Sequence, residues 1–406
     1  MTTLYLTGGA PVAVYRTDGA LVWGEGTTGP GTPPRVPQPP TGPAGNIITR
    51  AETASLGRTP KDRDSFTTTT AHVAVVDATS ITLVWVVNKT YGPDVGGTYS
   101  GMIDVNGAQY PITIGGATTW RVEPPTPDTV VTYTSDPIQV NVLKHDVIRV
   151  SMTVDADGDT GGVSSTLTDG KNGTDWSWRP ARIEAPSDKT SWLCIGDSIV
   201  QMPNSYLAQA CEARGLPSVT AGVGGDAHVY FPGRWRWRAA PHVAHSPYMI
   251  DQLGVNSPGR LVNSGLAFWN HAKANGVKYL VKVTISPTGT PGKPLPNPDV
   301  PTANAWLRDG APITSDKATA LPTGTTDPTT IRCDVIRPDG TIKKGTGGHP
   351  IDVVSDTGAA IEDTANPGYL TQAMYELTPG DTLHPTAPVQ AVLAGRLARD
   401  LEILGF

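Results

Sequence analysis

The sequence predicts an α/β fold for the second half of the chain and an all-β fold for much of the first half. The α/β assignment depends on an apolar run at residues 192–195 that indicates a buried strand, followed by a glycine turn and a helical stretch. It also depends on a C-terminal helix whose apolar residues recur about every 3.6 positions. The all-β assignment depends on Val-, Thr- and Ile-rich runs between residues 50 and 185, separated by Gly, Asp, Pro and Asn.

A serine stands where the first of these α/β strands turns into a helix. Gly196 allows a sharp turn, Ser198 follows it, and Pro203 opens a helical stretch that Gly215 closes. A hydroxyl placed there is exposed at the carboxyl edge of the sheet, beside the amino end of a helix. That position suits a nucleophile next to developing negative charge. The alternative is that Ser198 only caps the helix, as serines at such turns often do.

A short motif near the C-terminus offers the base that a serine nucleophile needs. A serine hydroxyl is a weak nucleophile, so it requires a base within hydrogen-bond reach and a partner that fixes the tautomer of that base. His384 and Asp381 supply both groups from one loop, and Pro385 and Thr386 then begin the last helix. Taken alone, this Asp-x-x-His spacing is a weak signal, and a solvated loop histidine is the alternative.

Four motifs of the chain resemble the sequence blocks of the SGNH hydrolases, also called GDSL esterases. Block one is matched by the Gly-Asp-Ser sequence that ends at Ser198, and block five by the segment from Asp381 to His384. The resemblance covers residues 188–406, and the blocks follow one another in the order of the family. It implies a flavodoxin-like, three-layer α/β/α domain with a parallel sheet.

Blocks two and three lie between these two motifs. Block two is similar to the glycine-rich residues 221–226, in which Gly225 best fits the oxyanion glycine, and block three is matched by residues 254–256, which end at Asn256. An ordinary glycine loop and a simple turn are the respective alternatives. Family members usually carry Asp after this asparagine, whereas the chain has Ser257. That departure puts the bracing of the Asn256 loop in doubt.

The resemblance implies a serine esterase mechanism. Ser198 would attack an ester carbonyl, His384 would take its proton, and Asp381 would orient His384. Backbone N–H groups of Ser198 and Gly225 and the side-chain amide of Asn256 would then stabilise the oxyanion. Each such donor is worth about 3–4 kcal/mol. No metal and no organic cofactor is implied.

Aromatic and basic side chains alternate directly after block two. Trp235, Arg236 and Trp237 belong to this run at residues 231–238. Because tryptophan faces stack on sugar rings and arginine binds carboxylates at two points, we name these residues, together with Asp197, as candidate substrate contacts. The alternative is a buried tryptophan pair with solvated arginines.

A long interval separates Asn256 from His384. It predicts a helix near residues 261–274, a strand at 279–285 and a helical piece at 303–307. The rest is rich in Gly, Pro and Thr and predicts inserted loops, with a hairpin between residues 331 and 343. Insertions at this edge of a sheet usually shape specificity.

Composition sets outer limits on the function. The chain has 406 residues, 38% of them hydrophobic, and a formal net charge of −6, which describes a globular protein and not a basic nucleic-acid binder. No apolar stretch reaches the ~18 residues of a membrane span, and the N-terminus lacks a secretory signal pattern. The three cysteines have no metal-ligand spacing, so we expect free, buried thiols at Cys194 and Cys211.

We expect three parts along the chain: an N-terminal arm at residues 1–48, a β-sandwich accessory domain at 49–186 and the SGNH domain at 187–406. The order resembles that of carbohydrate esterases with a jelly-roll accessory module. The Pro/Gly-rich segment of the arm has no core of its own, so we expect it to dock onto another chain or a virion assembly. A disordered linker is the alternative.

An acidic loop from Asp155 to Gly161 resembles a calcium-binding loop because its carboxylates alternate. The bidentate glutamate of such loops is missing, since the corresponding position is Thr166. A plain acidic hairpin loop is the better interpretation.

These observations favour a serine esterase that removes O-acetyl groups from a polysaccharide. The arm and the missing signal suggest a phage virion whose esterase trims host surface glycans, placed in the virion or outside the cell after lysis. The alternatives are a virion protein that binds glycan without hydrolysing it and a cytoplasmic acyl-thioesterase. We expect a homo-oligomer, no nucleic-acid partner and no membrane insertion.

Overall fold

The computed structural model describes residues 14–15, 21–22, 46–47, 49–53, 65–88, 96–123, 126, 129–157, 166–167, 176–177, 180–202, 205–378 and 380–406. The chain divides into two compact units, residues 1–36 and 37–406. In the first unit, strands β1 (Val14–Tyr15) and β2 (Leu21–Val22) form an antiparallel pair. The Pro/Gly-rich segment lies outside the described residues. The expected boundaries at 48/49 and 186/187 stay predictions.

Parallel strands form the central part of the largest sheet of the second unit. Strands β20, β22, β19, β18, β16, β17 and β4 lie side by side in this order, each parallel to its neighbours. The apolar run at residues 192–195 forms most of β16, whose five residues are all buried, as expected for a strand covered on both faces. The bounds are β20 Asp334–Ile336, β22 Val353–Ser355, β19 Tyr279–Val283, β18 Tyr248–Asp251, β16 Trp192–Gly196, β17 Ser218–Gly222 and β4 Thr49–Thr53.

Antiparallel strands continue the same sheet beyond β4. Strand β4 pairs with β5, and β12, β7 and β8 follow, with β9 also paired to β7. At the other end, β21 pairs with β20 and forms the hairpin that the sequence predicted. The bounds are β5 Ser65–Ala74, β12 Val147–Ala156, β7 Gly97–Val105, β8 Ala108–Pro111, β9 Thr119–Val122 and β21 Ile342–Lys343.

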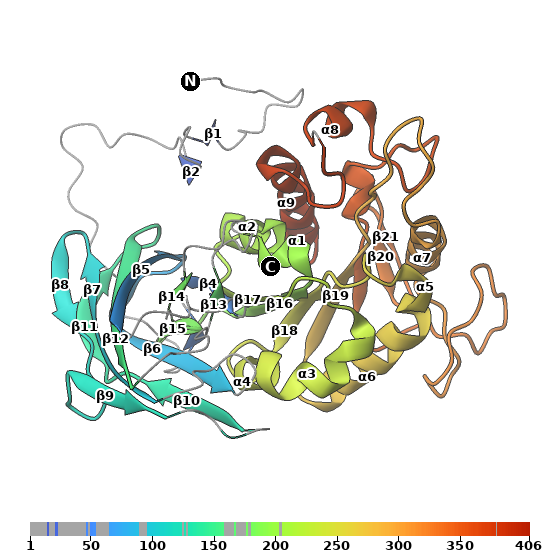
Figure 1. Cartoon of the computed structure of the whole chain (residues 1–406). Helices are drawn as coiled ribbons and strands as arrows, with labels where there is room; N and C mark the ends of the chain where they lie inside the picture. The colour runs from blue at the N-terminus through green and yellow to red at the C-terminus, as the bar shows by residue number, and fades with distance from the viewer. Residues whose placement is uncertain are drawn as a thin grey trace. The chain divides into compact units, whose positions relative to one another are not determined.

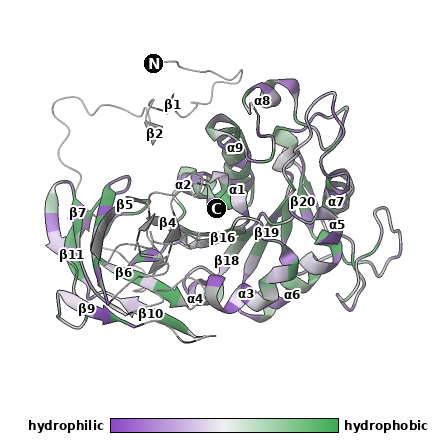
Figure 2. Ribbon diagram, viewed as in Figure 1, coloured by the Kyte–Doolittle hydropathy of each residue, from purple (hydrophilic) through white to green (hydrophobic). Residues whose placement is uncertain are grey.

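A second sheet contains β10, β6, β15 and β3 in this order, and β11 also pairs with β6. Buried residues of β6, β11 and β15 share one hydrophobic core with those of β7 and β12. In Figure 2 strand β6 carries the green, hydrophobic colour along much of its length. A further pair, β13 (Thr166–Leu167) with β14 (Trp176–Ser177), is antiparallel. The bounds are β10 Val130–Thr134, β6 Ala78–Asn88, β15 Arg182–Ala185, β3 Asn46–Ile47 and β11 Ile138–Val142.

Helices cover both faces of the parallel strands. Figure 1 shows α1, α2 and α9 on one side and α3 and α6 on the other. The periodicity of the last helix is confirmed, because Val389, Leu393, Leu397 and Leu401 of α9 are buried in the core. The bounds are α1 Ser198–Gln201, α2 Tyr206–Ala213, α3 Phe231–Arg238, α4 Ala240–Val243, α5 Pro258–Arg260, α6 Leu266–Ala274, α7 Asp299–Arg308, α8 Gln372–Glu376 and α9 Ala387–Ile403, with short helical turns η1 His228–Tyr230, η2 Leu261–Gly265 and η3 Gly358–Ala360. In the described part of the chain, no helix is long and apolar enough to cross a membrane.

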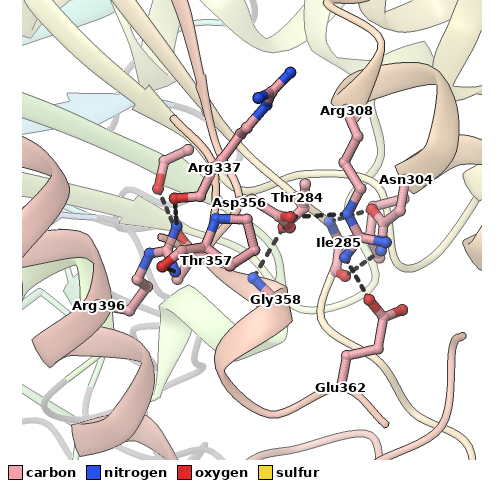
Figure 3. A network of polar contacts seen from close by, with 12 residues as sticks. Thr284, Ile285, Asn304, Arg308, Arg337, Asp356, Thr357, Gly358, Glu362 and Arg396 are labelled. Carbon is pink, nitrogen blue, oxygen red and sulfur yellow. Dashed lines mark hydrogen bonds and ion pairs between the residues drawn. The ribbon is translucent and has the colours of Figure 1, made fainter. Parts of the chain in front are cut away.

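A polar network holds the long interval between blocks three and five against the sheet (Figure 3). Asn304 of α7 accepts a hydrogen bond from the Ile285 N–H and donates one to the Ile285 carbonyl, both at 2.8 Å. Arg308, one turn further along α7, donates to Asp356 at 2.9 Å and also pairs with Glu362. Helix α7 is thereby fixed to the segments that follow β19 and β22. The interval therefore packs against the carboxyl ends of these parallel strands.

Candidate active site

The structure brings Ser198, His384 and Asp381 into one hydrogen-bonded line. The Ser198 Oγ lies 3.0 Å from the His384 Nε2, and the His384 Nδ1 lies 2.8 Å from the Asp381 Oδ2. Asp381 Oδ1 also accepts hydrogen bonds from the backbone N–H groups of Leu383 and His384. The carboxylate therefore fixes both the backbone of the loop and the ring of the histidine. This is the geometry in which an imidazole can take a proton from a hydroxyl.

The turn before Ser198 is set by its neighbours. A Cβ on Gly196 would lie 2.2 Å from Val200 Cγ2, so the strand can approach the start of α1 this closely only as glycine. Asp197 is the N-cap of α1 and accepts from the Ile199 N–H at 3.0 Å. Asp197, and not Ser198, thus caps the helix, which leaves the serine hydroxyl to His384.

Asp197 is fully buried, which corrects its prediction as a substrate contact. Its backbone N–H donates to Gln252 Oε1 at 3.1 Å, which joins the ends of β16 and β18. Burial raises the pKa of Asp197 to about 6, although the Ile199 N–H and the Gln252 amide act in the opposite direction. Its role is therefore to position the turn.

The block-two loop lies directly against α1. The Gly224 N–H donates to Gln201 Oε1, and a Cβ on Gly224 would lie 3.9 Å from that of Ser198. Gly225 has a φ of 74°, a left-handed conformation that favours glycine, and it is exposed. The loop thus presents backbone beside the serine hydroxyl.

A buried arginine, which the sequence reasoning missed, connects this loop to the serine strand. Arg238 of α3 donates to the carbonyls of Gly196, at 3.0 Å, and Ala221, and it pairs with the Asp226 carboxylate. It thereby joins the carboxyl ends of β16 and β17 to the residue that follows Gly225. Arg238 ends the aromatic and basic run at residues 231–238, but that pattern predicted substrate contacts or solvated arginines, whereas a fully buried guanidinium requires several polar partners.

Asn256 reaches the same loop from block three. Its Nδ2 donates to the Asp226 carbonyl at 2.9 Å. Gly254, two residues earlier, has a φ of 144°, and a Cβ there would lie 2.8 Å from Leu261 Cδ1. Blocks two and three are therefore in direct contact.

The Asn256 loop is braced from β19, which answers the doubt raised by Ser257. Lys282 is fully buried and donates to the carbonyls of Asp251, at 3.2 Å, and Leu253, at 2.6 Å. Burial alone would raise the pKa of Asp251, but Lys282 and His228 outweigh it and hold the pKa at about 2. A single lysine inside an apolar strand was the sequence signal for this role.

The predicted aromatic substrate loop is a helix, α3, and this corrects one of its contacts. Trp235 is only 5% exposed and packs edge-on against Phe268 and His271. A tryptophan buried in this way cannot stack on a sugar ring. Arg236 is exposed, so its proposed contact stays a prediction, and the side chain of Trp237 lies outside the described residues.

The histidine loop is tied to α1 through a glutamine that the sequence reasoning also missed. Gln390 of α9 accepts from the Tyr206 N–H at 2.8 Å, and its Nε2 lies 3.5 Å from the Ile199 carbonyl. Thr386, the N-cap of α9, donates to the Leu377 carbonyl at 2.7 Å. The helix that begins at Ser198 (α1) and the helix that follows His384 (α9) are therefore held together.

Cys194 and Cys211 are free and buried, as expected, and so is Cys333. No group of side chains in the described ranges could hold a metal ion. Asp157 of the acidic loop pairs with Arg121, and residues 158–165 lie outside the described part.

No protein-family model matches the chain, and no curated protein matches it. Similar solved structures include Axe2, an acetylxylan esterase from Geobacillus stearothermophilus (15% identity, 53% of this chain and 94% of Axe2, TM-score 0.35). A family two carbohydrate esterase from Clostridium thermocellum shows 11% identity over 88% of this chain and 98% of its own, with a TM-score of 0.35. A G-D-S-L family protein from Desulfitobacterium hafniense shows 13% identity over 52% and 99%, with a TM-score of 0.35. The likeness is distant, and the chemistry of this chain follows from its own side chains.

Proposed function

We propose that the protein is a serine esterase. The observation that carries the proposal is the line from Ser198 Oγ through His384 to Asp381, with contacts of 3.0 and 2.8 Å. Ser198 Oγ attacks the ester carbonyl carbon while His384 Nε2 takes the hydroxyl proton. His384 then gives this proton to the leaving alcohol, and an acyl-serine remains. Water, deprotonated by His384, releases the acid and restores the serine.

The oxyanion of each tetrahedral intermediate is stabilised by three donors in this proposal. They are the backbone N–H groups of Ser198 and Gly225 and the side-chain amide of Asn256. A primary amide carries two N–H groups, and Asn256 uses one to bind the Asp226 carbonyl. The other supplies a donor whose direction is already fixed, which is what oxyanion stabilisation requires.

We propose that the ester lies on a polysaccharide and that the acyl group is acetyl. Only six large hydrophobic residues are exposed in the described part of the chain, which argues against a broad surface for acyl chains. We also assign residues 187–406 to a flavodoxin-like SGNH domain and residues 49–186 to a β-sandwich accessory domain. The core that the antiparallel part of the largest sheet shares with the second sheet supports the second assignment.

Acetate release tests this function. Purified protein is incubated with p-nitrophenyl acetate and with O-acetylated polysaccharides, next to the Ser198→Ala and His384→Ala variants. We expect the wild type to release acetate and each variant to lose at least 1,000-fold in kcat. Binding of acetylated glycan without acetate release would instead support the alternative, a glycan-binding virion protein. A strong preference for thioesters would support the acyl-thioesterase.

We further propose a phage virion as the context, with the arm docked onto another chain and the protein a homo-oligomer. The motivation is the Pro/Gly-rich composition of the arm. Light scattering after gel filtration measures the oligomeric state, and limited proteolysis measures protection of residues 1–45. A monomer whose arm is cleaved in every context would contradict this part of the proposal.

A further inference from the structure

Most of the exposed large hydrophobic residues lie close in the sequence to the blocks that form the site. Six large hydrophobic residues are exposed in the described part of the chain, and four of them adjoin blocks two or five. Val229 and Tyr230 follow the block-two loop, Leu377 precedes the histidine loop, and Leu383 lies within it. Exposed apolar side chains on segments that adjoin or form the site are candidates for contact with a substrate.

Tyr230 is the most exposed of the six, at 52%, and it is the one aromatic residue among them. Its ring faces the guanidinium of Arg234, whose Cζ lies 5.1 Å from the ring centroid. Arg234 Nη1 in turn bonds Asp226 Oδ1 at 2.6 Å. The carbonyl of the same Asp226 receives the Asn256 amide. Three contacts therefore connect the ring to the oxyanion side of the site.

These contacts fix the orientation of the ring. A guanidinium over one face of a tyrosine is attractive, and here the arginine is itself held by a buried carboxylate. Arg234 remains 35% exposed, so further N–H donors are within reach of solvent beside the ring. A fixed aromatic surface with adjacent donors matches a pyranose ring, which has apolar C–H faces and hydroxyls at its edge.

We propose that Tyr230 and Arg234 form a subsite for the sugar that carries the scissile acetyl group. This inference rests on the proposed function, and it names the part of the substrate bound beside the serine. It also replaces the aromatic contact expected from the sequence. Trp235 of the same segment is buried in the core, and the tyrosine five residues earlier is exposed.

The test compares two substrates with the same acyl group and different alcohols. The substrates are p-nitrophenyl acetate and the best member of a panel of chemically O-acetylated oligosaccharides. We expect Tyr230→Ala to lower kcat/KM on the oligosaccharide at least tenfold, chiefly through KM, and on p-nitrophenyl acetate less than threefold. The Tyr230→Trp variant should keep kcat/KM within threefold on both substrates, because it preserves a stacking surface.

Met102→Ala is the matched control, because Met102 is 41% exposed on β7, within the antiparallel part. It should change neither rate. An unchanged rate of Tyr230→Ala on the oligosaccharide, or an equal loss on both substrates, would overturn the subsite. Wild-type activity on p-nitrophenyl acetate with none on the panel would overturn it and leave the esterase intact. Inactivity on both would refute the proposed function itself.

Discussion

At the scale of single residues, the residues of the proposed triad were recognisable in the sequence, whereas most of the residues that position them were not. Ser198, Asp381 and His384 belong to motifs whose chemistry requires those residue types, and the structure places the three in contact. Arg238 lies in the aromatic and basic run, but its positioning role depends on carbonyls that only the folded sheet brings together. Trp235 was misplaced because aromatic and basic residues alternate equally well on a surface loop and on a helix with one buried face.

Removing the Arg238 charge should weaken both the fold and the reaction. Arg238→Met leaves the buried Asp226 with Arg234 as its remaining ion-pair partner and removes the donor to two carbonyls. Breaking a buried pair in this way costs about 3–5 kcal/mol. We expect a loss of that order in urea unfolding and a lower kcat in what remains folded. Arg236→Met, on the exposed side of the same helix, should stay within about 0.5 kcal/mol of wild type.

Asp197 should make stability depend on pH. Its pKa is about 6 in the folded protein against an ordinary value of 3.8, so the folded state binds the proton more tightly. The contribution of Asp197 is therefore fully present below pH 3.8 and is lost as the pH rises through 6, by about 3 kcal/mol.

Urea unfolding of Asp197→Asn and wild type at several pH values measures this effect. Between pH 4 and 7, the unfolding free energy of the wild type should fall relative to that of Asp197→Asn. Asp251, with its pKa of about 2, is present in both proteins, so its effect cancels. A difference that does not change with pH would show that Asp197 is not buried as described.

At the scale of elements, most strands and helices follow from composition and periodicity. The sequence predicts strands at residues 97–105 and 138–142, and β7 and β11 have these bounds, while the hairpin of β20 and β21 is confirmed. The sequence also predicts a strand at residues 72–77, whereas β5 begins at Ser65, because its Thr-rich start at residues 65–70 has no apolar alternation. Strands β4 and β15 were missed, since each is short and finds its partners far away in the sequence.

A buried lysine of β19 adds side-chain contacts to its parallel pairing with β18. Lys282→Met removes the ammonium that binds the carbonyls of Asp251, the last residue of β18, and Leu253, which follows it, and leaves Asp251 with fewer partners. We expect a loss of about 3–5 kcal/mol in the free energy of unfolding. Lys278→Met, exposed just before β19, is the control and should change it by less than about 0.5 kcal/mol. Equal stabilities of the two variants would contradict the bracing role.

At the scale of the whole molecule, the largest sheet does not stop at the boundary that the sequence suggested. Strand β4 lies within the segment assigned to the accessory domain, yet it pairs in parallel with β17 and antiparallel with β5. Length and composition predicted an α/β part and an all-β part, but no local pattern could show that β4 pairs with a strand of each part. Strand pairing of this range depends on the rest of the fold.

A truncation tests this arrangement. A chain of residues 187–406 keeps Ser198 and His384 but lacks β4, so the β17 backbone has an open edge. Open edges promote association between chains. We expect this truncated chain to aggregate at concentrations where residues 37–406 remain dispersed, as light scattering would measure. A dispersed, fully active truncated chain would show that β4 is dispensable.

The double pairing of β4 also has a consequence for biosynthesis. The ribosome releases β4 long before β17, so the parallel sheet that positions Ser198 cannot be completed until β17 has been made. Until then β4 has β5 as its partner and an unsatisfied opposite side. Completion of this sheet therefore waits for a late, non-local strand pairing, which is slow and leaves nascent chains open to mispairing.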